Sequence, residues 1–368
     1  QALLINQMEY QHVAIDQFAR GMSPNIPLFV MYDSSVNADI SVEFSQGAYR
    51  YGHSQLRETI DALDPNGSLT AMVTHYALEA SFLNPEGFRT VGATALALGM
   101  TRQFSAEIDE MVTPALQQKL LGQNQDLAAI NIARGRDLGL PTLNELRRQL
   151  SGGMAANLNT LKQKLASNPD DPTLQKAVDQ TIALQAGLTP YSSWNDFQAA
   201  MIHPEAVANF IAAYSFDGDS NKADLVVGLA NGSIDPTNLN LSQSEALKAL
   251  GWSSNEAAGN AFTFMEGVDQ GYERIDAWNG GLAEKHVFLG ELGPTFDAIF
   301  ADQMTRLING DRFYYFWRLD LGLPQATQLI DSITTEQFKD VIERTTGARH
   351  LVGNVFFAAD DYVELGEQ

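Results

Sequence analysis

The run Ala-Ile-Asn-Ile-Ala-Arg-Gly-Arg-Asp-Leu-Gly-Leu-Pro at residues 129–141 is the most informative part of this chain of 368 residues. It predicts a helix that stops at Gly139 and Pro141. Asn131 and Arg134 are three residues apart, so they share one face of that helix. The amide can orient a neighbouring side chain, and the guanidinium can bind an anion. Alone, the run fits better a structural contact in which the amide caps or bridges helices and the arginines pair with acids.

A second run, Ala-Tyr-Arg-Tyr-Gly-His-Ser at residues 48–54, lies about eighty residues earlier. Helical spacing places Arg50, His53 and Arg57 on one face, and Gly52 permits close approach of a flat ligand. Alone, this run also fits a surface stripe of basic residues. Together the two runs supply an imidazole to bind a metal, an amide to set its tautomer and guanidiniums to bind carboxylates. That combination indicates haem.

The composition excludes several other classes of protein. The net charge is −22, from 45 acidic and 23 basic residues, which argues against binding to nucleic acid or to anionic membranes. No apolar run approaches the roughly 18 residues that a membrane span needs. The chain has no cysteine, which excludes disulfides, thiolate catalysis and iron–sulfur clusters. The acidity favours a protein that stays soluble in a salty or extracellular setting.

The hydrophobic spacing predicts a mainly α-helical fold. In the first part of the chain we expect helices over residues 2–20, 41–62, 70–83, 102–121 and 125–135. The pattern changes between 151 and 265, where glycine, proline and asparagine turns interrupt polar helical stretches. We therefore divide the chain into 1–150, an insertion or subdomain at 151–265, and a C-terminal helical part of the first domain at 266–368.

Two further patterns suggest metal binding only weakly. Asp217–Asp224 has oxygen ligands where an EF-hand loop has its first three, but Lys222 and Gly228 replace the required glycine and glutamate. We interpret it as a turn rich in Asp and Asn. The other histidines lack a metal-ligand spacing and are interpreted as structural or surface residues: His12, His75, His203, His286 and His350.

The chain resembles the animal-type haem peroxidases of the peroxidase–cyclooxygenase superfamily. Four stretches carry the resemblance, in the order of the family: 44–53, 129–141, 275–284 and 310–315. In its length and in its polar helical stretches broken by turns, the 151–265 insertion is more similar to those of bacterial members of the family. These members often belong to large secreted, calcium-rich proteins. The resemblance therefore implies an extracellular location.

The resemblance implies a helical peroxidase fold with a haem crevice between the His53 helix and the Asn131 helix, so that residues 1–150 form the proximal haem-binding core. His53 would be the proximal iron ligand, and Asn131 would accept its ring N–H. Arg50 and Arg134 would bind the haem propionates. The cofactor would be haem b or a derivative.

The resemblance also implies roles for other positions. Asp276 and Asp311 would be structural, and Leu138 stands where many relatives have a histidine that does not bind iron. In the family the distal histidine, its calcium loop and the distal arginine precede the proximal helix, and the Met8–His12 stretch does not match them. We therefore expect an upstream segment or a companion chain to supply the distal half, including any calcium site, and we do not assign His12 to it.

The implied function is a haem-dependent peroxidase that uses hydrogen peroxide to oxidise a small donor such as a phenol, a halide or a metal ion. Two alternatives stay open at this point. A fatty-acid dioxygenase of the same superfamily would need a long apolar channel and a radical-forming tyrosine, which the sequence does not single out. A haem-free scaffold or adhesion module would not need Arg50, His53, Asn131 and Arg134 together.

Overall fold

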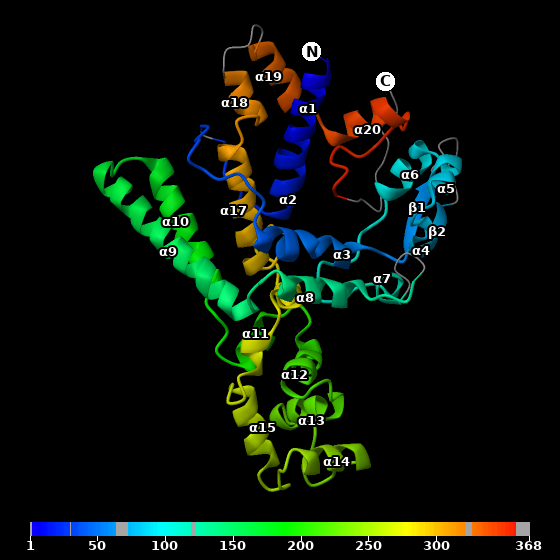
Figure 1. Ribbon diagram of the computed structural model, residues 1–368, viewed down its shortest axis with the longest axis vertical. Coiled ribbons are helices and arrows are strands. Elements are labelled where there is room, and N and C mark those ends of the chain that lie inside the picture. Colours follow the sequence, from blue (N-terminus) through cyan, green and yellow to red (C-terminus); the bar gives the residue numbers. More distant parts are fainter. Residues whose placement is uncertain (1, 30, 64–72, 119–122, 321–325, 358–368) are drawn as a thin grey trace.

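The computed structural model describes residues 2–29, 31–63, 73–118, 123–320 and 326–357. This part of the chain is mainly helical, which confirms the predicted fold class (Figure 1). Its two strands form one small antiparallel sheet. None of the described helices is both long enough and apolar enough to span a membrane.

The first part of the chain contains short helical segments and the two strands: α1 (Ala2–His12), the π-helix η1 (Val13–Ala19), α2 (Arg20–Met22), the π-helix η2 (Glu43–Gly47), the 3₁₀-helix η3 (Ala48–Tyr51), α3 (Gly52–Gln55), β1 (Thr59–Leu63), β2 (Val73–Ala77), α4 (Leu78–Ser81), α5 (Pro85–Val91), α6 (Ala93–Met100), α7 (Pro114–Gln118) and α8 (Leu127–Asp137).

The rest of the described chain is helical apart from its connecting loops. Its middle part contains α9 (Leu143–Ser167), α10 (Pro172–Gly187), α11 (Trp194–Ala200), the 3₁₀-helix η5 (Pro204–Ala206), α12 (Val207–Ser215), α13 (Ser220–Ala230), α14 (Leu241–Ala249) and α15 (Ala257–Met265). Its last part contains the 3₁₀-helix η6 (Gly271–Arg274), α16 (Ala277–Ala283), α17 (Pro294–Gly310), α18 (Tyr315–Asp320), α19 (Ala326–Thr334) and α20 (Phe338–Thr346).

Helix α17 runs through the first of two main hydrophobic cores, close to α1 and α2 in Figure 1. Pro294 occupies its first turn, where the missing N–H costs no hydrogen bond. Phe296, Phe300 and Met304 recur at helical spacing and are buried in this core. A side chain at Gly281 would collide with the ring of Phe296, so the glycine lets α16 approach α17 closely.

The second main core lies at the other end of the molecule, among α11–α15 (Figure 1). Trp194, Phe197 and Ile211 are fully buried there. Helices α9 and α10 pack against each other and project to one side of the molecule. The domain boundaries at 150 and 265 stay a prediction, since this core also takes in Leu143 and Ile275.

Three of the expected helices are wrong or too long. Part of 41–62 and part of 70–83 form β1 and β2, which pair from Thr59 with Ala77 to Leu63 with Val73. These short segments carry β-branched and aromatic residues, and helical periodicity cannot exclude a strand over so few positions. Of 102–121, the described part is helical only in α7; Gln103 instead hydrogen-bonds backbone atoms of β1.

The Asp217–Asp224 stretch forms a turn and a helix N-cap, as we interpreted it. Asp217 and Gly218 both have positive φ angles. The side chain of Asp219 accepts a hydrogen bond from the backbone N–H of Lys222 and so caps α13. This carboxylate satisfies a free N–H group at the start of the helix.

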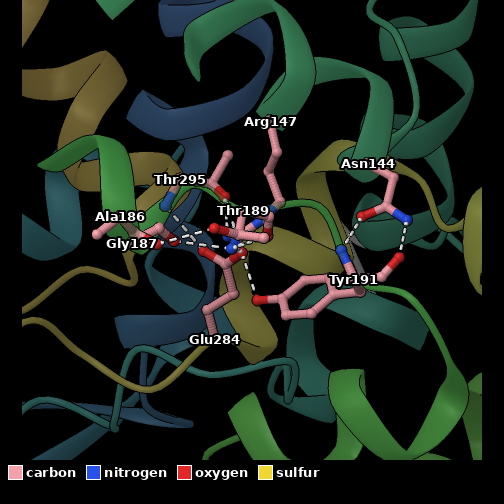
Figure 2. A network of polar contacts seen from close by, with 8 residues as sticks. All are labelled: Asn144, Arg147, Ala186, Gly187, Thr189, Tyr191, Glu284 and Thr295. Atoms are coloured by element: carbon pink, nitrogen blue, oxygen red, sulfur yellow. Dashed lines mark hydrogen bonds and ion pairs between the residues drawn. The ribbon is translucent and has the colours of Figure 1, made fainter.

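A buried ion pair joins the two cores. The Arg147 guanidinium on α9 is 2.5 Å from Glu284 Oε1, and both side chains are almost fully buried. Arg147 also donates to Thr295 Oγ1 at 3.0 Å, to the Gly187 carbonyl at 2.7 Å and to the Thr189 carbonyl at 2.8 and 3.1 Å (Figure 2). The contacts therefore fasten α9, the end of α10, the end of α16 and the start of α17 to one another.

Tyr191 completes this network. Its hydroxyl donates to Glu284 Oε1 at 2.9 Å, and its ring lies under the Arg147 guanidinium. Burial, and then the Glu284 carboxylate, raise the pKa of Tyr191, so it stays a proton donor. The Asn144 side chain exchanges two hydrogen bonds with the Tyr191 backbone, at 2.8 and 2.9 Å. The Glu284 charge is thus stabilised by a guanidinium and by neutral donors.

Replacing Arg147 with alanine would leave the Glu284 charge buried without its partner. We expect Arg147→Ala to lower the free energy of unfolding by about 3–5 kcal/mol. Arg148→Ala is the matched control, since the next residue makes exposed ion pairs with Glu145 and Glu273. It should cost less than about 1 kcal/mol. Denaturant unfolding measures both, and equal losses would show that the buried pair is not a special constraint.

Candidate functional site

The segment 43–55 presents one face to the core and another to α8. Phe44 and Tyr51 are buried, and their rings lie 5.5 and 6.2 Å from that of Phe300. The indole N–H of Trp278 on α16 donates to the Arg50 carbonyl at 3.3 Å. Helices α16 and α17 thereby form the support on which His53 is held.

His53 and Asn131 meet as the sequence predicted. His53 Nδ1 lies 2.7 Å from Asn131 Nδ2, although the residues are 78 positions apart. Asn131 is fully buried on α8, which begins with an Asp126 N-cap. Burial, and then the charge of Arg50, lower the pKa of His53. Its Nε2 atom makes no hydrogen bond to any residue that the structure describes.

The Asn131 amide has the opposite orientation from the one that the resemblance implies. Its NH₂ group faces His53, because its oxygen accepts a hydrogen bond from Arg50 Nη1 at 3.0 Å. Arg50 also donates to Gln46 Oε1 at 2.9 Å and to the Ser45 carbonyl at 3.1 Å. A guanidinium has only donors, so it takes the amide oxygen and leaves the amide nitrogen for the imidazole. In this state Asn131 donates to the ring and does not accept from it.

Arg50 and Arg134 form a pair of cations without a carboxylate. The three acceptors of Arg50 are neutral oxygens. The exposed Arg134 side chain makes no hydrogen bond or ion pair within the described part of the chain. Burial, and then the charge of Arg134, lower the pKa of Arg50, so the two guanidiniums are close. Guanidiniums without a carboxylate partner can bind an external anion.

The neighbouring charged residues of α8 and α16 have structural partners. Arg136 binds both carboxylate oxygens of Asp276, at 2.8 and 2.6 Å, and the Tyr214 hydroxyl donates to the same carboxylate. Asp311 accepts from the Phe313 N–H at the end of α17. Both aspartates therefore hold the fold together in this structure.

Three other positions from the sequence lie outside the His53–Asn131 contact. Arg57 follows the end of α3 and donates to the carbonyl of Phe104, so the predicted basic stripe stops at His53. Leu138 is exposed at the end of α8. His12 Nδ1 lies 3.1 Å from Asp16 and 3.2 Å from Tyr315, in contacts that join α1 and η1 to α18.

Two residues of the site were not found from the sequence. Gln46 orients Arg50, and its position four residues before Arg50 in a helical segment was the available signal. Trp278 supports the Arg50 backbone from α16. Nothing local in the sequence shows that contact, since the two residues are 228 positions apart.

We expect the His53 imidazole of the haem-free chain to titrate below its ordinary pKa of 6.5. Since the folded pKa is lowered, the unfolded chain takes up this proton first. The contribution of His53 to stability is therefore fully present above pH 6.5 and is lost as the pH falls below that value through the lower pKa of the folded state. Arg50→Gln should raise the pKa by removing the nearby positive charge. NMR titration measures both proteins, and a wild-type pKa above 6.5 or an unchanged variant would contradict this.

Comparison with known proteins agrees with the geometry. The family model described as animal haem peroxidase matches residues 3–179 and 253–356. Peroxinectin A of Dictyostelium discoideum is 25% identical over 353 residues, which cover 95% of this chain and 47% of that protein. This chain therefore spans about half the length of that relative.

Solved structures show the same fold. Peroxidase A from Dictyostelium discoideum matches with a TM-score of 0.59 and 23% identity, covering 96% of this chain and 50% of that chain. A fatty acid alpha-dioxygenase from Arabidopsis thaliana matches with a TM-score of 0.50 and 18% identity, covering 89% and 40%. The family match takes in both the His53 and the Asn131 segments, and it confirms the resemblance seen in the sequence. The chain belongs to the animal haem peroxidase family.

Proposed function

We propose that this chain forms the proximal side of a haem peroxidase site, with His53 as the iron ligand. The observation that carries the proposal is an imidazole whose Nε2 atom has no hydrogen-bond partner among the described residues, next to two guanidiniums without carboxylate partners there. Haem offers the complementary groups, a metal that binds imidazole and two propionate carboxylates. The residues present therefore fit this cofactor.

Arg50 and Asn131 would couple propionate binding to the orientation of His53. Iron binding through Nε2 requires the ring proton on Nδ1. Asn131 must then turn its oxygen toward the ring, which removes the acceptor of Arg50 Nη1. A haem propionate would then serve as the acceptor for Arg50. The anion at Arg50 and the tautomer of His53 thus favour each other.

When bound, haem supplies the reduction of hydrogen peroxide and the oxidation of a small donor such as a phenol, a halide or a metal ion. The residues of this chain would hold the His53 imidazole in place, hydrogen-bond its second ring nitrogen and bind the haem propionates. A neutral amide beside Nδ1 makes the imidazole less electron-rich than a carboxylate would. Haem b or a derivative fits this role.

We further propose that the distal half, with any calcium site, comes from an upstream segment or a companion chain, and that the protein is extracellular. The chain spans about half the length of peroxinectin A, and His12 is engaged by Asp16 and Tyr315. The likeness to the Arabidopsis dioxygenase concerns the fold alone. A haem-free scaffold leaves the unpaired charges of Arg50 and Arg134 unexplained.

His53→Ala should abolish the haem spectrum, because the site loses its iron ligand. The experiment titrates the chain with hemin and follows the Soret band. His75→Ala is the matched control, since His75 is an exposed histidine that pairs with Asp61 in the β1–β2 hairpin. It should bind hemin as the wild type does. An unchanged spectrum in His53→Ala would refute the proposed ligand.

Arg134→Ala should weaken hemin binding about tenfold, the loss of one charge-assisted hydrogen bond. The dimethyl ester of the porphyrin, which has no carboxylates, should bind the wild type and this variant alike. Arg57→Ala is the control, because Arg57 binds the Phe104 carbonyl instead. A variant that loses equal affinity for hemin and for the ester would show that Arg134 does not bind a propionate.

A further inference from the structure

His203 lies between α11 and η5, where its ring faces carboxylates from another part of the chain. Its Nε2 atom is 3.1 Å from Asp109 Oδ2 and 3.7 Å from Glu107 Oε2. All three potential ligand atoms lie within 4.8 Å of one another. No local sequence pattern predicts this cluster, because 94 residues separate His203 from Asp109.

The opposite nitrogen of the same ring also faces a carboxylate. His203 Nδ1 lies 3.5 Å from Glu205 Oε1. In metal sites a carboxylate on one ring nitrogen holds the proton there and leaves the other nitrogen free to bind the metal. His203 thus has a carboxylate near Nδ1, while its Nε2 atom is directed at Asp109 and Glu107.

The cluster holds more acidic than basic side chains. Glu110 lies close enough to interact electrostatically with His203, Asp109 and Glu205, and both of its carboxylate oxygens are buried without a hydrogen-bond partner. Within the described part of the chain, no lysine or arginine forms an ion pair with any of these carboxylates. Four acidic side chains therefore surround one imidazole, an arrangement that a bound cation would stabilise.

We propose that Glu107, Asp109 and His203 bind a divalent cation of the first transition row, such as Zn²⁺. With bonds of about 2.0–2.1 Å, ligand atoms around tetrahedral zinc are about 3.3 Å apart. The separations of 3.1 and 3.7 Å lie on either side of this value. An imidazole ligand favours such a metal over calcium or magnesium, which prefer oxygen ligands.

The ion would connect the two main cores. Asp109 follows Ile108 of the first core, and His203 lies between Met201 and Ala206 of the second. Asp109 also lines an open cavity of about 650 Å³, which gives an ion access from solvent. The bound ion would link the two main cores. Its ligands are different residues from those of the proposed haem site at His53.

Calorimetric titration of the metal-stripped chain with Zn²⁺ tests the proposal, in a His53→Ala background that removes the proposed haem ligand. We expect one zinc ion per chain, an increase in melting temperature on binding, and no competition from Ca²⁺. Absence of saturable binding in this protein would overturn the proposal, and it would leave the haem assignment untouched.

Variants locate the zinc site. His203→Gln and the exposed Glu107→Gln should each weaken zinc binding about tenfold or more, and circular dichroism checks their folding. His75→Gln is the matched control and should keep wild-type affinity, since His75 has a single carboxylate partner in the hairpin. Zinc binding that survives both His203→Gln and Glu107→Gln would also overturn the proposal.

Discussion

The buried pair of Arg147 and Glu284 is the constraint on which the rest of the structure depends. Two charges removed from water are costly unless each finds partners, and here the partners of Arg147 come from three segments: residues 187–189 at the end of α10, Glu284 after α16 and Thr295 in α17. Glu284 closes α16, and Thr295 begins α17. Because α16 and α17 support the segment that carries His53, the pair sets the position of the candidate haem ligand from a distance.

At the candidate site the geometry follows from the donors and acceptors available. Arg50 can only donate, so it binds the Asn131 oxygen and turns the amide nitrogen toward His53. An anion near Arg50 and Arg134 would release that oxygen for the ring. In the proposed function the same side chains would bind the haem carboxylates and set the position of the proton on His53, so haem binding would be coupled to the orientation of the imidazole.

Much of this was predictable from local sequence. The helix of Asn131 follows from local hydrophobic spacing, and the family resemblance implied that His53 lies beside Asn131. The roles of Arg50 and Arg134 toward haem stay a prediction. The β1–β2 hairpin was missed because five-residue strands carry too little periodicity to identify them. The amide orientation of Asn131, the Arg147–Glu284 network and the His203 cluster were missed for another reason. Each depends on which distant segments pack together, and 137 residues separate Arg147 from Glu284.

The central claim is that His53 binds iron through Nε2, and resonance Raman spectroscopy of the ferrous haem complex tests it most directly. The account predicts an iron–histidine stretching band that shifts when the protein's histidines carry ¹⁵N. In His53→Gly the band should disappear and return when free imidazole is added, with the isotope shift now following the added imidazole. A band in His53→Gly that still follows the protein's own histidines would contradict the account, because another residue would then hold the iron.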